Sequence, residues 1–308
     1  MVRPQRRPLL IRPSTLNRFG ILGINSRNIR FLMESNTRSL YPYVDNKALT
    51  KKICDSHQIP IPETYAIIER FGDIPKYTRL IEKLNEFVVK PARGTGGHGI
   101  VVVVGKRGNT FKTSKEEIYS VARIRYHIST ILSGLYSLGA CPDAAIIEKR
   151  IASHHVFEGL AVEGTPDVRL IIYKGTPVMA MLRLPTKASR GRANLHQGAA
   201  GVGINLETGQ TYGGVWRDRL FDVHPDTGMH LDGLIIPQWS HVVAIAVKLS
   251  KVIGLQYVGI DIVLDGERGP LVLEANARPG LSVQIANRCG LWPRVKKADY
   301  KPSDLNQQ

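Results

Sequence analysis

The stretch GIDIVLDGERGPLVLEANARPG, residues 259–280, contains two apolar runs of strand length joined by a Gly-rich turn, and it predicts a β-hairpin. In the register that leaves residues 266–269 as the loop, Asp261 lies opposite Glu274. Asn276 follows Glu274 by two residues and shares its face of the strand. Directly opposed like charges destabilise a sheet unless a cation lies between them. The hairpin therefore predicts a cation site.

The donors of this site suit a hard cation. Two carboxylates and one amide oxygen are typical of magnesium that also holds phosphate oxygens. We therefore expect Asp261, Glu274 and Asn276 to bind one or two Mg²⁺ ions, with Glu274 bridging, or Mn²⁺ in their place. The alternative is structural: Asp261 forms a salt bridge with a lysine, and Asn276 only shapes the turn into residues 278–280.

A second stretch, KPARGTGGHGIVVVV at residues 90–104, contains the pattern G-x-G-x-x-G of dinucleotide-binding folds. In those folds the glycines lead into a helix, whereas IVVVV favours a strand. We therefore expect a hairpin whose bare N–H groups fold over phosphates while Lys90 faces the same anion. The alternative is a mobile hairpin without a ligand. The glycine tip consists of Gly94, Thr95, Gly96, Gly97, His98 and Gly99.

The composition is that of a globular protein, since 43% of the 308 residues are apolar and can form a sizeable core. No run approaches the roughly 18 apolar residues that a membrane-spanning helix needs. Cys54, Cys141 and Cys289 are odd in number and lack metal-ligand spacing. They predict buried free thiols and a reduced, cytoplasmic compartment.

The formal net charge of +16 implies attraction to anions, which include nucleic acids, acidic membrane surfaces and phosphorylated or carboxylate substrates. Much of the excess lies in residues 1–33, which contain seven arginines and no acid. A solvated basic arm is the simplest interpretation, with an organelle-transit segment as the alternative, because interspersed prolines and arginines argue against a signal peptide. A nucleic-acid-binding module is disfavoured, because stacking aromatics are few and the basic residues are scattered.

Apolar periodicity predicts a mixed α+β chain in which antiparallel hairpins outnumber β-α-β units. The expected helices cover residues 46–58, 71–86, 114–136 and 239–253, with a short one near 25–35. The expected strands cover residues 87–90, 100–104, 144–151, 168–185 with a turn at 174–177, and 257–276. A basic Gly-rich loop is expected over residues 186–203, and a polar tail at the end of the chain.

Five elements, in order, resemble the ATP-grasp superfamily and specifically the RimK-like alpha-L-glutamate ligases: Lys90 with GTGGHG, IIEKRI, PDVRLII, NLHQGA and the 259–280 hairpin. The similarity extends from about Asp45 to Trp292. It implies an α+β ATP-grasp fold, in which two lobes with antiparallel sheets grip ATP. The implied boundaries are 1–45 for a basic, truncated pre-grasp segment, 46–147 for the lobe with the glycine tip, 148–295 for the lobe with the magnesium site, and 296–308 for the tail.

The resemblance also implies roles for individual residues. Lys47 would approach the ATP phosphates, and Lys90 would lie between phosphate and adenine. The backbone of residues 148–151 would read the adenine edge, and Asp167 would hold the ribose. The implied cofactor-binding residues are Lys47, Lys90, the glycine tip, Glu148, Lys149, Arg150, Ile151, Asp167 and Arg169. The implied catalytic residues are Arg169, which would hold phosphate, and Arg183 and Asn194, which would face the phosphates and the reacting carboxylate. Arg278 is a fourth catalytic candidate, at a position where the sequence departs from the family. Asp261, Glu274 and Asn276 match the magnesium ligands of the family.

Departures from the family pattern concern the substrates. The family's NLHRGG is here NLHQGA, and Gln197 cannot pair with a carboxylate as a guanidinium does, which leaves the added amino acid open. Arg278 replaces the serine of Asn-x-Ser-Pro-Gly near the expected metals, where it would bind a carboxylate or stabilise an acyl phosphate. Only about 45 residues precede Lys47, so we expect an acceptor site that is either truncated or completed by a partner chain, such as a second copy.

The implied activity is ATP-dependent ligation of a carboxylate to an amine. The carboxylate attacks the γ-phosphate to give an acyl phosphate and ADP, and the amine of a peptide, protein or small molecule then displaces phosphate. Such phosphoryl transfer requires charge neutralisation and alignment, which Lys90, Arg169 and Arg183 would supply with the metals. The alternative is an ATP-grasp kinase acting on a small anionic metabolite. His196 and the basic run 189–196 are further candidates for substrate contact, against an ordinary solvated loop.

Overall fold

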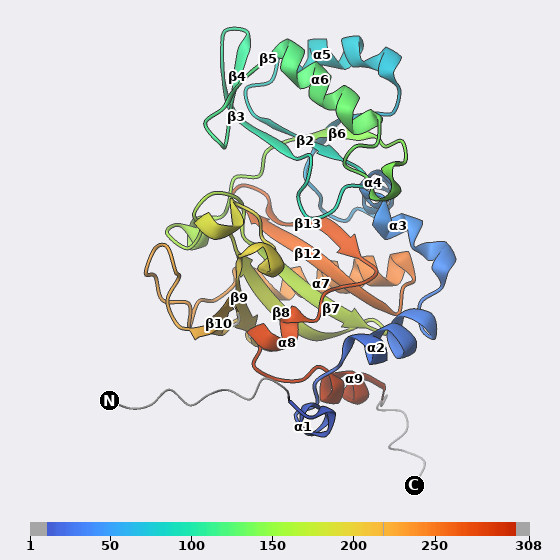
Figure 1. The fold of residues 1–308 in the computed structure, drawn as a ribbon, viewed down its shortest axis with the longest axis vertical. Coiled ribbons are helices and arrows are strands. Elements are labelled where there is room, and N and C mark those ends of the chain that lie inside the picture. Colours follow the sequence, from blue (N-terminus) through green and yellow to red (C-terminus); the bar gives the residue numbers. More distant parts are fainter. Residues whose placement is uncertain (1–10, 218, 300–308) are drawn as a thin grey trace.

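The structure, a computed structural model, describes residues 11–217 and 219–299. Within them the strands form two antiparallel sheets of six and seven strands, with the first sheet above the second in Figure 1. The strand order is β1-β6-β2-β3-β4-β5 in the first sheet and β11-β10-β9-β8-β7-β12-β13 in the second. The predicted α+β class is confirmed. No helix in the described ranges is both long and apolar enough to cross a bilayer.

The first sheet is covered on one face by two helices (Figure 1). Helix α5 (Ile74–Ile81) starts with a proline in its first turn, and α6 (Val121–Leu132) packs Ile124, Ile128 and Ile131 on the sheet. The strands of this sheet are β1 (Thr64–Ile68), β2 (Phe87–Pro91), β3 (Val101–Arg107), β4 (Thr110–Thr113), β5 (Ile118–Ser120) and β6 (Ala145–Glu148).

The helix predicted over residues 114–136 is shorter than expected. Residues 118–120 pair with β4 as strand β5, and Ser120 then caps α6 by accepting a hydrogen bond from Arg123 N at 3.1 Å. The helix ends at Leu132, and Gly134, with φ of +85°, then turns the chain. The apolar spacing continues through both turns, so spacing alone could not find these ends.

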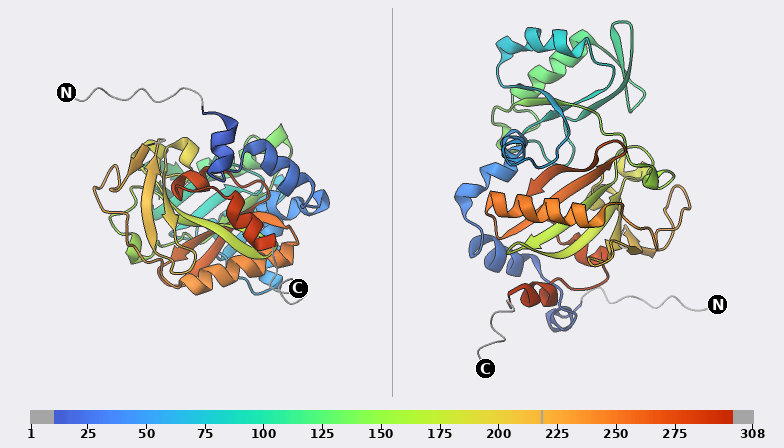
Figure 2. Two further views of the ribbon diagram at one scale, coloured as in Figure 1. Left: turned by 90° about the horizontal axis from the view of Figure 1, so that it is seen from below. Right: turned by 180° about the vertical axis from the view of Figure 1, so that it is seen from behind.

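The second sheet has apolar residues on both faces and is covered on both (Figure 2). Helix α7 (Trp239–Ile253), which has the predicted bounds, packs Val242, Ala246 and Leu249 on one face. Helices α8 (Ser282–Ala286) and α9 (Trp292–Asp299) pack on the other. The strands are β7 (Asp167–Tyr173), β8 (Thr176–Leu184), β9 (Ala200–Ile204), β10 (Thr211–Trp216), β11 (Arg219–Phe221), β12 (Tyr257–Asp265) and β13 (Gly269–Asn276).

The loop predicted over residues 186–203 is too long, because β9 begins at Ala200, and the sequence pattern does not predict β10 or β11. β9 and β10 are rich in glycine and lack the branched alternation that marks a strand. The small residues have a packing reason: a Cβ at Gly201 would lie 2.7 Å from the Leu195 side chain. These strands are therefore selected by close packing and not by propensity.

The N-terminal segment packs on the second sheet. It contains α1 (Pro13–Arg18), α2 (Ile24–Ser26), a π-helical turn (Arg27–Met33) and α3 (Pro42–Asp45), and it buries Phe31 beside α9. Arg27 is also buried and donates from Nη1 to Pro279 O at 2.8 Å. The short helix expected near residues 25–35 is confirmed. Helix α1 buries no side chain, but the solvated arm expected over residues 1–33 is wrong from Gly20 onward, because Leu22, Phe31 and Leu32 enter the core.

Residues 1–10 and 300–308 lie outside the described ranges, and with them most of the predicted tail. Residues 296–299 of that tail form the last turn of α9. The proposed boundaries between the N-terminal segment, the two lobes and the tail stay a prediction.

Phe31→Ala is expected to lower the free energy of unfolding by about 3–5 kcal/mol, the usual cost of removing a buried phenylalanine. The Phe31 ring lies 5.2 Å from that of Tyr173 and 5.4 Å from that of Tyr257, so its loss opens a cavity in the core. Urea unfolding measures the change. Phe19→Ala, at a ring that is 62% exposed, is the control and should cost under about 0.5 kcal/mol. Equal effects of the two substitutions would show that the segment is only loosely attached.

Candidate functional site

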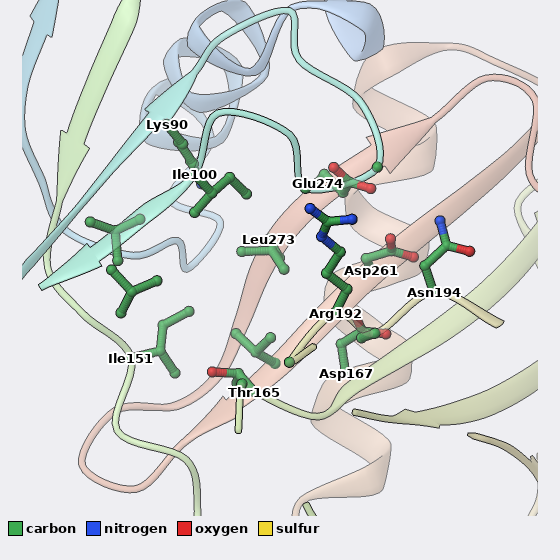
Figure 3. A pocket seen from close by; sticks show the side chains of 18 of the residues that line it. Lys90, Ile100, Ile151, Thr165, Asp167, Arg192, Asn194, Asp261, Leu273 and Glu274 are labelled. Carbon is green, nitrogen blue, oxygen red and sulfur yellow. The ribbon is translucent and has the colours of Figure 1, made fainter. Parts of the chain in front are cut away.

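A cavity of about 690 Å³ lies between the two sheets, with residues of the glycine tip on one side and strands of the second sheet on the other (Figure 3). The predicted residues that line it are Lys47, Lys90, Gly94, Gly96, Gly97, His98, Glu148, Arg150, Ile151, Asp167, Arg169, Arg183, Asn194, Asp261, Glu274 and Asn276. The predicted residues that do not line it are Thr95, Gly99, Lys149 and Arg278. The structure therefore gathers most of the predicted site in one place.

The 259–280 hairpin pairs as predicted where it carries its carboxylates. Asp261 lies opposite Glu274, and Gly259 lies opposite Asn276. Beyond Asp261 the register shifts by one residue, because Leu273 is an extra residue in a β-bulge and faces the cavity. Gly269 consequently pairs with Asp265, and the loop is residues 266–268 instead of the expected 266–269. The bulge is invisible to a register drawn from spacing alone.

Four charged side chains on β7, β8 and β12 form a continuous network, which we call the charge network: Asp167, Arg183, Asp261 and Arg169. Arg169 donates to both oxygens of Asp261, at 2.7 and 2.6 Å. Arg183 donates to both oxygens of Asp167, at 2.5 and 2.8 Å, and from Nη2 to Asp261 Oδ2 at 2.6 Å. Asp261 is fully buried, so these bonds replace water entirely. Its partners are arginines, not the lysine of the structural alternative.

The two aspartates of the charge network differ in protonation. Burial would raise the pKa of Asp261, but Arg169 and Arg183 outweigh it and hold that pKa below its usual range. For Asp167, burial outweighs Arg183 and, with the nearby negative charge of Asp261, raises the pKa to about 7. A proton taken up near neutral pH therefore goes to Asp167.

The three predicted magnesium ligands touch one another. Asn276 Nδ2 lies 3.3 Å from Asp261 Oδ2 and 3.2 Å from Glu274 Oε1, and Lys47 Nζ lies 3.7 Å from Glu274 Oε2. Among the described residues, no three His, Cys, Asp or Glu side chains gather as a metal cage. Two carboxylates and an amide therefore fit a magnesium ion that completes its shell with phosphate and water, not one held by protein ligands alone.

A buried lysine that the sequence argument missed lies beside Lys90. Glu148 Oε1 lies 2.5 Å from Lys90 Nζ, and Glu148 Oε2 lies 2.8 Å from Lys51 Nζ. All three side chains are buried, and the two lysines hold the pKa of Glu148 below its usual value although burial opposes them. Glu148 thus positions Lys90. Lys51 follows Lys47 by four residues on α4 (Lys47–Ser56), and this spacing, which puts both on one helix face, was the available signal.

The glycine tip is anchored at its base and at its end. Lys47 Nζ donates to Gly94 O at 2.7 Å, and His127 Nε2 lies 2.9 Å from Gly99 O. Gly96, Gly97 and Gly99 have positive φ, and a Cβ at Gly99 would lie 2.5 Å from the Tyr136 ring. Glycine at 99 is therefore required by both conformation and contact.

A contact from the turn between β8 and β9 reaches the tip. Gln197 donates from Nε2 to Gly96 O at 3.2 Å and accepts from Arg192 Nη1 at 3.1 Å. Arg192 itself lines the cavity among the predicted residues (Figure 3). In the sequence, Arg192 is a candidate only as part of the basic run 189–196. Gln197 therefore supplies no positive charge itself, but its two hydrogen bonds link Arg192 to the glycine tip.

Arg278 is not where the sequence argument expects it. Its Nη1 lies 3.7 Å from Asp45 Oδ2, and its guanidinium lies 4.7 Å from the centre of the Tyr41 ring. Asp45, the last residue of α3, and Tyr41, which directly precedes that helix, hold the Arg278 side chain on the outside of the hairpin. The expectation that Arg278 stands at the metals is wrong in this structure.

A protein-family model described as sugar-transfer associated ATP-grasp matches residues 26–300. The chain belongs to this ATP-grasp family. The predicted resemblance to the superfamily and the ATP-grasp fold are thereby confirmed. A Citrobacter koseri protein named probable alpha-L-glutamate ligase is 47% identical over 133 residues, which cover 41% of this chain and 33% of the relative. The cyanophycin synthetase of Crocosphaera subtropica is 25% identical over 285 residues, which cover 81% of this chain and 29% of that one.

The matched segments cover about a third or less of the length of each of these curated relatives. Those relatives are ligases by name. Among solved structures, D-cycloserine synthetase DcsG is 13% identical with a TM-score of 0.48, with 85% of this chain and 72% of that chain covered.

Asp167→Asn is expected to remove a pH-dependent part of the stability. The pKa of Asp167 is about 7 in the folded protein and lower when unfolded, so the folded state retains a proton that the unfolded chain releases. The wild type should therefore lose stability relative to the variant as pH rises from 5 to 7, by at most about 1.4 kcal/mol per pH unit, with no further change above that.

Urea unfolding of both proteins at pH 5, 6, 7 and 8 checks this expectation. Asp222→Asn, at a side chain that is 73% exposed, is the control and should show a constant difference from the wild type. A constant difference for Asp167→Asn as well would contradict the assignment of the proton.

Proposed function

We propose that this ATP-grasp protein is an ATP-dependent carboxylate–amine ligase that forms an amide through an acyl phosphate and releases ADP and phosphate. The observation that carries the proposal is the pairing of Asp261 with Glu274 in the cavity that the glycine tip also lines. The names of the curated ligases support it.

The nucleotide would lie between the glycine tip and the linker after β6. Lys90 and Lys47 would meet the phosphates. Lys149 N already donates to Glu63 O at 2.8 Å, whereas the amide of Ile151 has no acceptor in the described part of the chain. We therefore assign the adenine contact of the linker to Ile151 N–H and to backbone carbonyls. Arg183 donates to both oxygens of Asp167, so we assign Asp167 to positioning that guanidinium.

The charge that develops during transfer would be met by groups already in place. Asp261, Glu274 and Asn276 would hold magnesium, which when bound neutralises the phosphate oxygens and aligns them. Arg183 and Arg169 are fixed by bidentate bonds, so they need little reorganisation to stabilise a transferring phosphoryl group. Asn194 would orient the reacting carboxylate, and the glycine tip, tied to Gln197, would exclude water that hydrolyses an acyl phosphate.

The substrates are proposed by class. The relatives' names point to an amino acid as one partner, and the family description associates the fold with sugar transfer, so we propose an amino acid and a sugar-containing molecule as the first pair to screen. A partner chain that completes the acceptor side stays a prediction.

The test is a screen of carboxylates with ATP, Mg²⁺ and hydroxylamine. A ligase yields ADP together with a hydroxamate, whereas a kinase yields ADP and a stable phosphorylated product. Glu274→Gln should lower hydroxamate formation by at least about 100-fold, because it removes a charged ligand of the phosphate-bound metal. Glu267→Gln, in the exposed loop of the same hairpin, is the matched control and should retain activity. ADP release without any hydroxamate across the screen would sink the ligase proposal.

A further inference from the structure

Helices α1 and α9 lie side by side at the end of the molecule farthest from the first sheet (Figures 1 and 2). The turn after α1 attaches it there, since Gly20 O accepts from Trp292 N at 3.0 Å and a Cβ at Gly20 would lie 2.6 Å from the Pro293 ring. The α1 side chains themselves are not buried by any described part of the chain. The surface formed by residues 11–33 and α9, which we call the N-terminal surface, thus includes a helix without a packing partner.

Large apolar side chains are concentrated on this segment. Residues 11–33 contain more exposed ones than any other stretch of that length in the described ranges: Ile11, Leu16, Phe19, Ile24, Ile29 and Met33. Phe19 is 62% exposed, Ile24 61% and Met33 66%. Single exposed apolar side chains are common, but a group of them in one short segment indicates a surface that a partner covers.

The backbone of this segment is held firmly although these side chains are not. Gln284 of α8 accepts from Leu22 N at 2.8 Å and donates to Leu22 O at 3.0 Å. Leu22, Phe31 and Leu32 turn into the core. The exposed apolar side chains of the same segment are therefore presented on a fixed support, and they do not belong to a loose tail.

The N-terminal surface is also cationic. Residues 11–33 contain no Asp or Glu, and Arg12, Arg18 and Arg30 are exposed. The Arg30 guanidinium lies 5.0 Å from the centre of the Trp292 ring, and Lys296 Nζ of α9 lies 5.4 Å from it, so the two segments bring their cations together. The sequence of residues 1–10 adds three further arginines.

The acids nearby reduce this charge little. Asp299, the acid of α9, lies 2.6 Å from Lys174 Nζ and is thereby neutralised. Glu34, the first acid of the chain, is exposed directly after the segment. The surface therefore attracts an anionic partner and repels a second copy of itself.

The pairing of apolar and cationic residues selects among anionic partners. Arg12 follows Ile11, Arg18 precedes Phe19, and Arg30 follows Ile29. At a membrane surface such side chains insert between the headgroups while the guanidinium groups pair with lipid phosphates. A nucleic acid would meet the arginines but would leave the aliphatic side chains in water, because its bases stack on aromatic rings.

We infer that the N-terminal surface docks the protein on an anionic lipid membrane. Phe19 and Ile24 enter the headgroup layer, and the exposed arginines of the segment pair with lipid phosphates. No residue of the N-terminal surface lines the cavity between the sheets in the part of the chain that the structure describes. Docking there consequently leaves that cavity unoccupied.

Vesicle sedimentation tests the lipid preference with the full chain and without ATP, so the result does not depend on the ligase proposal. The apparent Kd should be at least about tenfold lower for vesicles containing about one third phosphatidylglycerol than for pure phosphatidylcholine, because several cations each add to the attraction. High salt should weaken this binding, because it screens the charges. Equal binding to both vesicles, or binding to neither, overturns the inference.

The double variant Phe19→Ser with Ile24→Ser tests the apolar contribution. It should raise the apparent Kd for the anionic vesicles at least about tenfold, since it removes the two side chains that enter the headgroup layer. The matched control is Phe71→Ser with Ile118→Ser, at side chains beside the first sheet that are each 57% exposed, and it should leave the Kd unchanged. An unchanged Kd for the test pair overturns the inference.

The double variant Arg12→Gln with Arg18→Gln tests the charge. Each lost arginine should raise the apparent Kd about fivefold, and the salt dependence should become shallower. The control, Arg70→Gln with Arg79→Gln, removes the same charge from exposed positions beside the first sheet and should have little effect. Equal effects of the two pairs would show attraction by net charge alone and would overturn the docking surface.

Phe19→Trp locates the contact. Brominated phosphatidylglycerol should quench the fluorescence of this variant beyond the quenching of the wild type, because bromine in the acyl chains quenches only an indole that enters the bilayer. Phe71→Trp, at a similarly exposed ring, should show no added quenching. The absence of added quenching at position 19 overturns the inserted position.

Two further measurements identify a different occupant. Tighter binding to single-stranded oligouridylate than to anionic vesicles, at equal phosphate concentration, would assign the surface to nucleic acid and overturn the inference. Light scattering measures the oligomeric state, and a dimer that Phe19→Ser with Ile24→Ser dissociates would assign the surface to a second copy and overturn it as well. We expect tighter binding to the vesicles, and the same oligomeric state for the wild type and this variant.

Discussion

The lateral alignment of β7, β8, β12 and β13 is the constraint on which the candidate site depends. Arg169 and Glu274 are the two cross-strand neighbours of Asp261, and Arg183 is the neighbour of Asp167. Buried charges are stable only when they are paired and hydrogen-bonded, so these residues require one another. A slip of one residue in any of these strands would turn the carboxylates to the opposite face, towards α7. The charge network therefore specifies the register as much as the register positions the network.

One face of β7 shows how core and site share an element. Its inner end carries Asp167 and Arg169 in the cavity, and its outer end carries Ile171 and Tyr173 in the core formed with the N-terminal segment. The same face thus changes from polar to apolar within a few residues. The apolar end holds the strand rigidly, which is the support that a precisely placed polar group needs.

Local patterns in the sequence were sufficient for much of this arrangement. The opposition of Asp261 and Glu274 follows from alternation within one hairpin, and the strand after the glycine tip follows from its β-branched residues. Helix α7 was found within its bounds because its apolar stripe is continuous and Gly254 ends it. In each case the deciding residues lie within about 20 positions of one another.

Features set by distant contacts could not be found in this way. The role of Lys51, on α4, depends on its ion pair with Glu148 of β6, a residue distant in the sequence. Arg278 lies outside the site because it contacts Tyr41 and Asp45. The link from Gln197 to the glycine tip joins segments about 100 residues apart. The burial of Phe31 depends on α9 and the second sheet, which no reading of the N-terminal segment alone supplies.

The Glu148 cluster has a consequence for engineering. Lys51 and Lys90 share a single carboxylate, so the wall of the cavity keeps one surplus positive charge away from water. Replacing Lys51 by a neutral side chain of similar length would relieve that cost in the ligand-free chain, and it would also weaken the attraction for a polyanion. A neutral residue at position 51 would thus raise thermostability and lower nucleotide affinity. Selection for a more stable protein would therefore weaken nucleotide binding first at this helix.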